Sequence, residues 1–523
     1  MNVSSNYVPR IRPHQLPKVC VAVVGRTAEE MVEKAEALVR DNPFVEFRLD
    51  YLPHPLLALK PLQDFLEYHP HVYAIATCRR AANGGKFRGS IAAELDILGK
   101  AAAAGCQLVD LELQTALKTK APQLKKLRER AALILSYHDF RGTKKLEETL
   151  ATMEALQADF YKIVGTATTL HDNVVMMKFL EEQSYRHSLI GLCMGEQGII
   201  SRVLGQRAGS VFTFASLTAG EETAPGQVTA KMLRDIYRVD KVDTATRVYG
   251  VAGDPVAHSL SPLLMNIAFR RENVNAVYLA LHAKTMKDLR ACMSDIPISG
   301  LSVTMPYKQE ILEDLDNTDP YTAKTGACNT VVRGQDGKLY GFNTDVAGVI
   351  RPLEQRIALT GAKVLVLGAG GGARAAVFGL KERGAEVWIL NRSAAKGQKL
   401  AKSARVKVLR RADLKKLTFD IILNATPVGM GHSGSHSKEM PLKPEELKAR
   451  YVFDMVYDPL ETPLLRAARA RGLEVIPGIE MFVQQAARQF EIWTGKPAPA
   501  DEMRRVALME LQERAAQATA KKK

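Results

Sequence analysis

Gly361-Ala-Lys-Val-Leu-Val-Leu-Gly-Ala-Gly-Gly-Gly-Ala-Arg-Ala375 is the stretch that decides the fold of the C-terminal half of this chain. Its first seven residues form an apolar run typical of a strand, and the glycines after them permit a tight turn. Ala375–Lys381 then has the composition of a helix, and Glu386–Leu390 predicts a second strand. This order predicts a Rossmann domain in which the helix N-terminus faces a pyrophosphate. The expected anion-binding positions are Gly368, Gly370, Gly371, Gly372 and Ala373.

The residues after the second strand distinguish between the two nicotinamide dinucleotides. An enzyme that uses NAD usually has an acidic residue there, which accepts a hydrogen bond from the ribose 2′-hydroxyl. This chain has Asn391-Arg392-Ser393, with Lys396 shortly after. A carboxylate would repel a 2′-phosphate, whereas Arg392 can pair with it through two parallel hydrogen bonds. The sequence therefore favours NADP, and a merely solvated charge at a helix start explains the spacing less well.

Length and composition are those of a globular protein with several domains. The chain has 523 residues, of which 46% are hydrophobic and 25% are charged. No apolar run is long enough for a membrane span, and Met1–Pro17 lacks the apolar core of a secretory signal. The same segment leaves little room for a long transit peptide, so we expect a cytoplasmic protein. The six cysteines form no C-x-x-C pair, and we expect reduced core residues and no metal site.

The net charge of +15 raises the possibility of nucleic-acid binding. Lysine and arginine are spread along the chain, however, and no signature of a nucleic-acid module is present. An anionic substrate and a 2′-phosphorylated cofactor would account for part of the excess. The terminal Lys521–Lys523 is expected to be a frayed tail. We therefore expect small-molecule substrates, with no nucleic-acid or membrane partner, and the oligomeric state stays open.

The N-terminal half has a different sequence pattern, in which eight apolar runs alternate with helical segments. These runs are Val19–Gly25, Phe44–Asp50, Val72–Cys78, Gln107–Leu113, Ala131–Tyr137, Ala158–Val164, Ser188–Met194 and Ser210–Ala215. Continuous apolar strands that alternate with helices indicate a parallel sheet, because both of its faces are then covered. Eight repeats predict a closed (β/α)8 TIM barrel, whose active site lies at the C-terminal ends of the strands.

Polar residues near these strand ends predict a site. Glu46, Arg48 and Asp50 alternate with apolar residues, so we expect them to share one face of a strand, either as a site or as a structural arginine–carboxylate network. Lys162 lies within an apolar strand, where burial would favour a neutral amine that can form a Schiff base with a ketone. His138, at the end of the neighbouring strand, suits proton transfer. The alternative for Lys162 is a snorkelling or ion-paired residue.

Ordered motifs surround the dinucleotide segment. They are Gly253-Asp-Pro-Val-Ala-His-Ser-Leu-Ser-Pro262, Val303-Thr-Met-Pro-Tyr-Lys308, Gly326-Ala-Cys-Asn-Thr330, Gly341-Phe-Asn-Thr-Asp345, Asn424-Ala-Thr-Pro-Val-Gly-Met430, Asp454-Met-Val-Tyr457 and Met481-Phe-Val-Gln-Gln-Ala486. Residues 247–510 resemble the shikimate dehydrogenase family. Reduction of a ketone needs a hydride and a proton, and Lys308 with Asp345 can relay the proton. The resemblance makes this pair the catalytic dyad.

The same resemblance implies the remaining binding residues of this half. It assigns the substrate to Ser259, Ser261, Thr304, Asn329, Tyr457 and Gln485, and adds Thr426 and Gly478 to the cofactor set. Ser259 and Ser261 have a simpler alternative, because Pro262 starts a helix and both hydroxyls suit its cap.

The barrel half, over about residues 18–238, resembles type I 3-dehydroquinate dehydratase. The motifs are Thr77-Cys-Arg79, Met194-Gly195, Ser201-Arg202 and Ala224-Pro-Gly-Gln227, together with the Lys162 and His138 segments. The resemblance implies an imine on Lys162 and proton transfer by His138, which Glu46 would orient. It assigns substrate binding to Arg48, Arg79, Arg202, Thr223 and Gln227. Two departures are Thr223, where the family commonly has serine, and Asn83, where it often has glutamate.

Three domains follow from these assignments: a barrel at 18–240, an αβ substrate domain at 247–345 completed by 478–510, and a Rossmann NADP domain at 346–477. The two resemblances imply consecutive shikimate-pathway steps, because the product of the first, 3-dehydroshikimate, is the ketone that the second reduces. The nearest alternative is a quinate-oxidising enzyme, and the hydroxyl of Ser261 disfavours it. A binding protein with inactive sites is a further alternative, which intact Lys162, His138, Lys308 and Asp345 oppose.

Overall fold

The computed structural model describes residues 11–256, 259–431 and 439–520. The predictions made for the first ten residues and for Lys521–Lys523 lie outside this part of the chain. Two compact units are present. Unit 1 comprises Met1–Thr246 and Leu281–Pro297, and unit 2 comprises Arg247–Ala280 and Ile298–Lys523.

Unit 1 contains an eight-stranded parallel sheet. Its strands are β1 (Val19–Val23), β2 (Phe44–Arg48), β3 (Tyr73–Thr77), β4 (Leu108–Glu112), β5 (Ala132–His138), β6 (Phe160–Thr166), β7 (Leu189–Met194) and β8 (Thr213–Ser216), in the order β7-β6-β5-β4-β3-β2-β1-β8. The chain just before β8 bonds to β7, where Val211 N donates to Leu189 O at 2.8 Å. On its other side β8 pairs with β1 in parallel. The ring is thereby closed, which confirms the predicted barrel.

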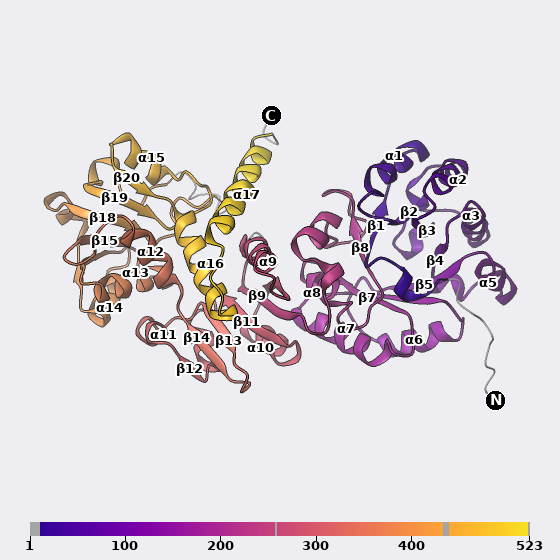
Figure 1. Cartoon of the computed structure of the whole chain (residues 1–523), viewed down its shortest axis with the longest axis horizontal. Helices are drawn as coiled ribbons and strands as arrows, with labels where there is room; N and C mark the ends of the chain where they lie inside the picture. Colours follow the sequence, from indigo (N-terminus) through magenta and orange to yellow (C-terminus); the bar gives the residue numbers. More distant parts are fainter. Residues whose placement is uncertain (1–10, 257–258, 432–438, 521–523) are drawn as a thin grey trace. The chain divides into compact units, whose positions relative to one another are not determined.

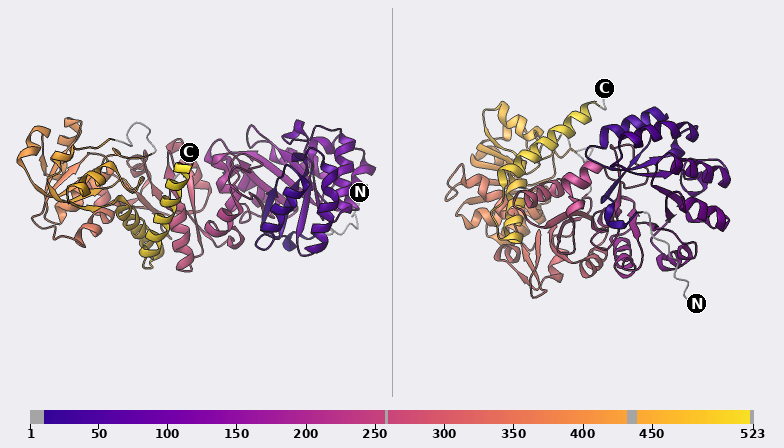
Figure 2. Two further views of the ribbon diagram at one scale, coloured as in Figure 1. Left: turned by 90° about the horizontal axis from the view of Figure 1, so that it is seen from above. Right: turned by 45° about the vertical axis from the view of Figure 1, so that its right-hand side comes forward.

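Helices surround these strands (Figures 1 and 2). They are α1 (Ala28–Leu38), α2 (Leu59–Tyr68), α3 (Ile91–Ala103), α4 (Leu113–Ala116), α5 (Ala121–Arg128), α6 (Leu146–Glu154), α7 (Leu170–Gln183) and α8 (Ile199–Leu204), and unit 1 also holds α10 (Met286–Asp295). One end of the barrel interior is apolar: Phe44, Phe160 and Phe212 are fully buried together with Ile11 and Leu16 of the N-terminal segment. This plug leaves the opposite, C-terminal ends of the strands for polar groups.

The first sheet of unit 2 is mixed. Its strands are β9 (Arg247–Gly253), β10 (Ala276–His282), β11 (Ile298–Val303), β12 (Asn317–Thr318), β13 (Thr330–Arg333) and β14 (Leu339–Phe342), in the order β10-β9-β11-β13-β14-β12. β9 and β11 pair in parallel, whereas β13 runs antiparallel to both β11 and β14. The helices α9 (Ser261–Arg271) and α11 (Pro320–Thr325) belong to this part of the chain.

The second sheet of unit 2 is fully parallel. Its strands are β15 (Lys363–Leu367), β16 (Glu386–Leu390), β17 (Lys407–Val408), β18 (Phe419–Asn424), β19 (Ala449–Asp454) and β20 (Glu474–Ile476), in the order β17-β16-β15-β18-β19-β20. This order is the 3-2-1-4-5-6 arrangement of the Rossmann fold, as predicted. The helices are α12 (Asp345–Glu354), α13 (Gly371–Glu382), α14 (Ala394–Ala404), α15 (Pro463–Ala470), α16 (Gly478–Thr494) and α17 (Ala500–Ala520).

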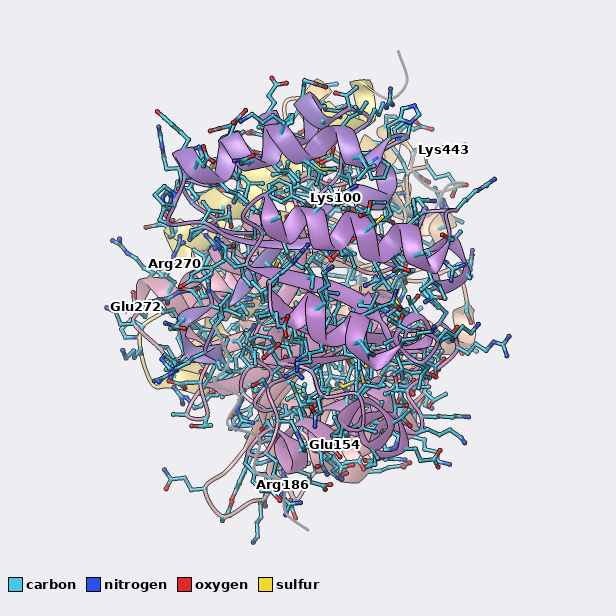
Figure 3. All side chains as sticks on the ribbon, turned by 90° about the vertical axis from the view of Figure 1, so that its right-hand side faces the viewer. Lys100, Glu154, Arg186, Arg270, Glu272 and Lys443 are labelled. Atoms are coloured by element: carbon cyan, nitrogen blue, oxygen red, sulfur yellow. The ribbon has the colours of Figure 1, made fainter. Side chains whose placement is uncertain are left out.

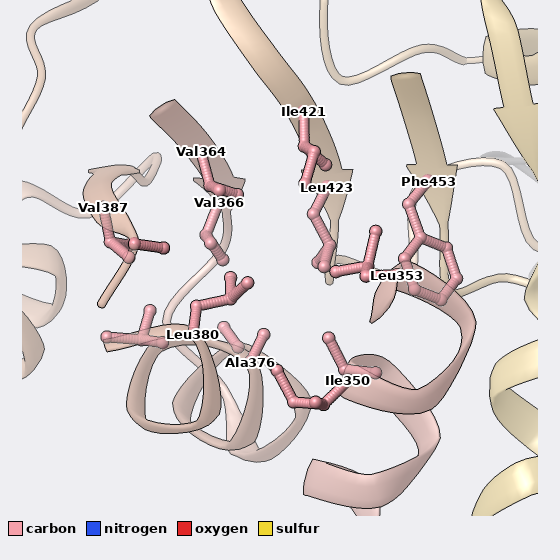
Figure 4. Close-up of a cluster of buried hydrophobic side chains, with 14 of the residues drawn as sticks. Ile350, Leu353, Val364, Val366, Ala376, Leu380, Val387, Ile421, Leu423 and Phe453 are labelled. Atoms are coloured by element: carbon pink, nitrogen blue, oxygen red, sulfur yellow. The ribbon is translucent and has the colours of Figure 1, made fainter. Parts of the chain in front are cut away.

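The core of the Rossmann sheet explains why its strands are nearly continuous apolar runs. Figure 4 shows Val364, Val366 and Leu423 facing Ala376 and Leu380 of α13. α13 begins at Gly371, four residues before the predicted start, because the first helical N–H groups need no intrahelical partner and the glycines leave room for neighbours. A Cβ at Gly372 would lie only 2.9 Å from Met455 Cε.

Other sequence expectations fit the structure in part. α16 begins at Gly478, three residues before the predicted Met481, and a Cβ at Gly478 would lie 2.4 Å from Val456 O. All six cysteines are buried and free. Within the described residues no helix has the length and apolar character needed to cross a bilayer. Charged side chains such as Lys100 and Arg186 cover the outer surface of unit 1 (Figure 3).

Candidate active sites

The pocket at the C-terminal ends of the barrel strands brings together every barrel residue that the sequence singled out for binding or catalysis. These are Glu46, Arg48, Arg79, His138, Lys162, Arg202, Thr223 and Gln227. Strands β2, β5 and β6 supply four of them, Arg79 follows β3, Arg202 lies on α8, and Thr223 and Gln227 lie in the loop after β8, so the barrel fold assembles them. Glu46, Arg48, Arg79 and Lys162 are more than nine-tenths buried, and such charges are unfavourable unless each one is paired or meets a ligand.

Lys162 lies on β6 and is 4% exposed. Its Nζ donates a hydrogen bond to Asp110 Oδ2 at 3.0 Å and lies 3.8 Å from the centre of the Phe214 ring. Burial raises the pKa of Asp110, but the charges of Lys162 and Arg79 outweigh that effect and hold the pKa below its ordinary value. This carboxylate comes from β4, so the apolar pattern of the β6 segment does not indicate it. Lys162 of the free protein is thus an ion-paired amine over an aromatic face, as the alternative reading held.

His138 ends β5, and the acid beside it is Glu112 at the end of β4. The Glu112 Oε2 atom lies 3.0 Å from His138 Nδ1, and Glu112 Oε1 accepts from the His138 backbone N–H at 3.2 Å. Burial lowers the pKa of His138, and the Arg79 guanidinium lowers it further. Because a carboxylate only accepts, Nδ1 carries the ring proton and Nε2 is left as a base.

The prediction that Glu46 orients His138 is therefore wrong. Glu46 accepts a hydrogen bond from Thr77 Oγ1 at 2.7 Å, one strand away on β3. β2 lies three positions from β5 in the sheet, whereas β4 is adjacent to it and supplies Glu112, the acid that bonds to His138. Glu46 still lines the same pocket.

The barrel arginines differ in their partners. Arg48 forms two hydrogen bonds of 2.9 Å with Asp50, which lies in a 3-10 turn after β2 and not on the strand face as predicted. Arg79 donates to Asp110 at 2.9 Å and its Nε lies 3.4 Å from Glu112. Arg202 is 1% exposed, pairs with no carboxylate among the described residues, and has its pKa lowered to about 10 by burial. A buried cation without a counter-ion is suited to an anionic ligand.

The loop after β8 and the turn after β3 complete the rim of this pocket. Gln227 Oε1 accepts from Thr223 N at 2.7 Å and from Thr223 Oγ1 at 3.2 Å, which folds the loop onto itself. Asn83 is buried and its Nδ2 has no partner within the described part of the chain. The neighbouring Gly84 has a φ of +81° and packs against Phe140, whose ring stacks on His138.

A second site lies in unit 2, where β11 ends and α12 begins. Lys308 Nζ donates to Asp345 Oδ2 at 2.5 Å, and Asn329 Nδ2 donates to Asp345 Oδ1 at 2.8 Å. Asp345 is 4% exposed, whereas the Lys308 side chain is 22% exposed. The carboxylate is thus held by two donors, and the ammonium keeps a face toward solvent where a substrate carbonyl can reach it.

The other predicted substrate residues lie on several elements of unit 2. Ser259 Oγ accepts from Ser261 N at 3.2 Å in the turn before α9, whose N-cap residue is Leu260 and has no side-chain cap, so this hydroxyl holds the turn and does not cap the helix. Thr304 follows β11, and its methyl group would lie 2.3 Å from a Cβ at position 253. Tyr457 and Gln485 share a neighbour: the Tyr457 ring stacks on Phe482 at 4.5 Å, and Gln485 Nε2 donates to Phe482 O.

The predicted dinucleotide site fits its ligand. Gly368 has a φ of +115°, which favours glycine, and a Cβ there would lie 3.2 Å from Thr426 Cγ2. A Cβ at Gly370 would meet no atom within 4 Å, so the backbone N–H groups at the start of α13 are open to an anion. A Cβ at Gly371 would lie 3.7 Å from Lys308 Cδ, so the glycine turn lies next to the Lys308–Asp345 pair.

The residues after β16 also fit a 2′-phosphate. Arg392 and Lys396 are exposed and carry no ion pair to any described residue, and Ser393 caps α14. Asn391 Nδ2 donates to Ser393 O at 2.8 Å, which fixes the turn. Gly478, by contrast, is required by its packing against Val456, and the structure gives it no separate role.

Sequence reasoning missed several residues of both sites. In the barrel these are Asp110, Glu112, Thr77 and Ser136, which donates to both acids at 2.7 and 3.0 Å. A signal was present, because Leu108-Val-Asp-Leu-Glu112 alternates polar and apolar residues as the segment after Phe44 does. In unit 2 the missed residues are Tyr278, Ser302, Thr330, Thr344 and Gln489.

Four family models match the chain. They are type I 3-dehydroquinase over residues 19–244, the shikimate dehydrogenase substrate binding domain over 251–331, shikimate / quinate 5-dehydrogenase over 353–455 and the shikimate 5′-dehydrogenase C-terminal domain over 478–508.

Relatives of known name match the whole chain or its second half. A chloroplastic bifunctional 3-dehydroquinate dehydratase/shikimate dehydrogenase of Arabidopsis thaliana is 34% identical over 504 residues, which is 92% of this chain and 82% of the relative. A shikimate dehydrogenase (NADP(+)) of Pyrococcus furiosus is 39% identical over 281 residues, which is 52% of this chain and 99% of the relative. A solved shikimate 5-dehydrogenase of Thermus thermophilus, in complex with NADP(H) and shikimate, is 33% identical with a TM-score of 0.47, over 50% of this chain and 99% of that one.

Proposed function

The chain belongs to the family of bifunctional 3-dehydroquinate dehydratase/shikimate dehydrogenases, and we propose that it carries out both reactions through Lys162 in the barrel and Lys308 with NADPH in unit 2. The observation that carries the proposal is that each unit holds a lysine paired with a buried carboxylate, beside a fitting ligand site. In the barrel, Lys162 lines the same pocket as His138, whose pKa is lowered by burial, and in unit 2 Lys308 lies beside the glycine turn.

In the barrel, the Lys162 amine adds to the C3 carbonyl of 3-dehydroquinate, and water leaves as the imine forms. His138 Nε2 then removes a proton from C2, and the electron pair moves through the enamine to expel the C1 hydroxyl, which leaves as water with a proton from His138. Hydrolysis of the imine consumes one water and releases 3-dehydroshikimate. Arg202 pairs with the substrate carboxylate, since it has no other counter-ion.

In unit 2, the Lys308 ammonium donates a proton to the ketone oxygen of 3-dehydroshikimate, and Asp345 holds that ammonium in place. The reduced dinucleotide, when bound, supplies the hydride to the ketone carbon. Gly368, Gly370 and Gly371 would receive its pyrophosphate, and Arg392 would pair with its 2′-phosphate. Ser261, Thr304 and Asn329 hold the carboxylate and ring hydroxyls of the substrate.

We also propose the domain division at 18–240, 247–345 with 478–510, and 346–477. It is supported by the buried cores of unit 2. Residues of α16, such as Phe490 and Trp493, share a cluster with Tyr249 and Phe269 near the start of unit 2, whereas the Rossmann strands form two separate clusters, one with α12 and α13 and one with α15.

A coupled assay tests the proposal. Protein supplied with 3-dehydroquinate and NADPH should consume NADPH. Lys162→Ala should abolish this consumption while leaving reduction of added 3-dehydroshikimate intact, and Lys308→Ala should do the reverse, stopping at 3-dehydroshikimate. Borohydride should trap the substrate on the unmodified chain and not on Lys162→Ala. A Lys162→Ala protein that still dehydrates 3-dehydroquinate would exclude the imine mechanism.

The same assay separates shikimate from quinate. Ser261, the first residue of α9, keeps the second hydroxyl of the Ser259-Leu-Ser261 motif, which favours shikimate over quinate. We expect oxidation of shikimate with NADP+ to exceed oxidation of quinate in steady-state comparison. Equal rates would instead assign the quinate activity as well.

A further inference from the structure

A chain of buried hydrogen bonds crosses unit 2 behind the Lys308–Asp345 pair. Tyr278 OH donates to Ser302 Oγ at 2.6 Å, and Ser302 Oγ donates to Gln489 Oε1 at 2.7 Å. Gln489 Nε2 donates to Thr330 Oγ1 at 3.1 Å and to Asn329 O at 3.2 Å. Within this series of hydrogen bonds, Gln489 is the single side chain that links α16 to β11 and β13, and it is 2% exposed.

The chain continues to the carboxylate. Thr330 Oγ1 donates to Asn329 Oδ1 at 2.9 Å, and Asn329 Nδ2 donates to Asp345 Oδ1 at 2.8 Å. Lys308 occupies the other oxygen, Asp345 Oδ2. The side chains of Asn329 and Thr330 therefore connect Asp345 to Gln489 of α16. Gln489 and Ser302 extend the connection to Tyr278.

The direction of these bonds is fixed at two points. Thr344 N can only donate, so the atom of Asn329 that faces it at 2.8 Å must be the oxygen, Oδ1. Asn329 O can only accept, so the atom of Gln489 that faces it must be the nitrogen, Nε2. The amide of Asn329 then turns its NH2 group toward Asp345. If the side-chain amide of Asn329 or Gln489 were reversed, its oxygen would face another hydrogen-bond acceptor.

We propose that Gln489 is a positioning residue of the reductase: it fixes the rotamer of Asn329, and through it the carboxylate that holds Lys308. This inference rests on the proposed function of the Lys308–Asp345 pair. Gln489 touches neither that pair nor the predicted substrate residues Ser261 and Thr304 through any hydrogen bond of its own. Gln489 acts on the geometry of the pair through its Nε2 group, which donates to both Asn329 O and Thr330 Oγ1.

The physical reason is that a buried amide network specifies geometry only while all its members are satisfied. Replacement of Gln489 by leucine leaves Ser302 without an acceptor and Thr330 without its donor. Thr330 and Thr344 lie 3.2 Å apart and can then bond to each other, which removes the Thr330 bond from Asn329 Oδ1 and leaves that oxygen held by Thr344 N alone. A displacement of about 1 Å in a catalytic group reduces the rate by on the order of 100-fold.

The test uses the full chain with Gln489→Leu and Gln489→Glu. Val483→Ala is the matched control, because Val483 is also 2% exposed on α16 and lies outside the chain of hydrogen bonds. Dehydration of 3-dehydroquinate by the barrel is the internal measure of folded protein. We expect Gln489→Leu to lower the reductase kcat by about 10- to 100-fold with KM changed less than about threefold. Gln489→Glu should recover activity as the pH falls, since only the protonated acid can donate to Asn329 O.

Hydrogen exchange gives a readout that needs no substrate. The Thr344 amide is protected by Asn329 Oδ1, so its exchange should be faster in Gln489→Leu and unchanged in Val483→Ala. Loss of kcat, acid recovery of Gln489→Glu and faster Thr344 exchange together support the proposal. A Gln489→Leu protein whose Thr344 exchange matches the unmodified chain, or whose kcat stays within twofold of Val483→Ala, overturns it. An unmodified chain without reductase activity would refute the proposed function, and the exchange result would still decide the role of Gln489.

Discussion

Glu112→Gln is the change that tests the barrel site most directly, because the structure assigns Glu112, and not Glu46, to His138. The negative charge of Glu112 favours protonated His138 and partly offsets the effects of burial and Arg79, which lower the pKa of this histidine. Glutamine has nearly the same shape but no charge. The pKa of His138 should therefore fall further, and the histidine becomes a weaker base for the C2 proton.

The size of the effect follows from the geometry. At the 3.0 Å separation of Nδ1 and Oε2, with an effective dielectric constant of about 20, two unit charges interact by about 5 kcal/mol. Relaxation reduces such effects, and a close opposite charge shifts a pKa by about 1–3 units, or about 1.4–4 kcal/mol. We therefore expect the acid limb of the dehydratase pH profile to move down by at least about one unit, and kcat near neutral pH to fall by about 10- to 1,000-fold.

The measurement is the rate of 3-dehydroshikimate formation between pH 4 and pH 9, followed by absorbance of the conjugated enone. Glu46→Gln is the control, since it removes a buried carboxylate of the same pocket that bonds to Thr77. It should leave the acid limb where it is, whatever its effect on kcat. Equal shifts in both variants, or no shift in Glu112→Gln, would refute the assignment of Glu112 to His138.

Three further predictions follow from the described contacts. Asp110→Asn leaves Lys162 and Arg79 without their shared partner, so the barrel should lose about 3–5 kcal/mol of stability, seen as a lower melting temperature. Because the pKa of folded Asp110 lies below its unfolded value of about 3.9, this stabilisation is present above about pH 4 and is lost as the pH falls further, so the two melting curves should converge in acid; a constant difference would contradict it. Arg392→Glu should lower the ratio of kcat/KM for NADPH to that for NADH by at least about 100-fold, because the carboxylate repels a 2′-phosphate and accepts from a 2′-hydroxyl; Lys399→Gln on the same helix, α14, is the control, and equal ratios in both variants would exclude the role of Arg392. Gly370→Val should raise KM for NADPH without lowering the melting temperature, since its Cβ meets open space, whereas Gly478→Val should lower the melting temperature because its Cβ meets Val456 O; a KM unchanged in Gly370→Val would count against the pyrophosphate site.

Much of the fold could be predicted because its signals are local. Eight apolar runs, each of strand length, were sufficient for the barrel, and the stretch around Gly368 was sufficient for the Rossmann sheet. Element boundaries were less accurate where a residue's conformation depends on a neighbour. Asp50 leaves the strand because it folds back to pair with Arg48, and α13 begins at Gly371 because the first helical N–H groups need no intrahelical partner, so glycines can form its first turn.

The sites were predicted unevenly for a related reason. Residue types in the barrel strands predict Lys162 and His138, and the family resemblance predicts the Lys308–Asp345 pair, but the partners of the two barrel residues depend on which strands are adjacent and in what register. Glu112 pairs with His138 because β4 and β5 align Glu112 with Ser136, and no local pattern contains that alignment. Gln489 is more distant still, since it meets Asn329 across 160 residues of sequence.

Arg202 gives the barrel a property that matters for screening. Its guanidinium is buried without a counter-ion among the described residues of the free protein. Any small carboxylate that fits the pocket therefore pairs with this buried charge as it binds. Ligand present at about 100 times its dissociation constant would add about 2.7 kcal/mol to the stability of the domain. Thermal-shift screening of carboxylate fragments against the full chain should therefore rank inhibitor scaffolds by their acid group first, and neutral isosteres of the same shape should give little signal.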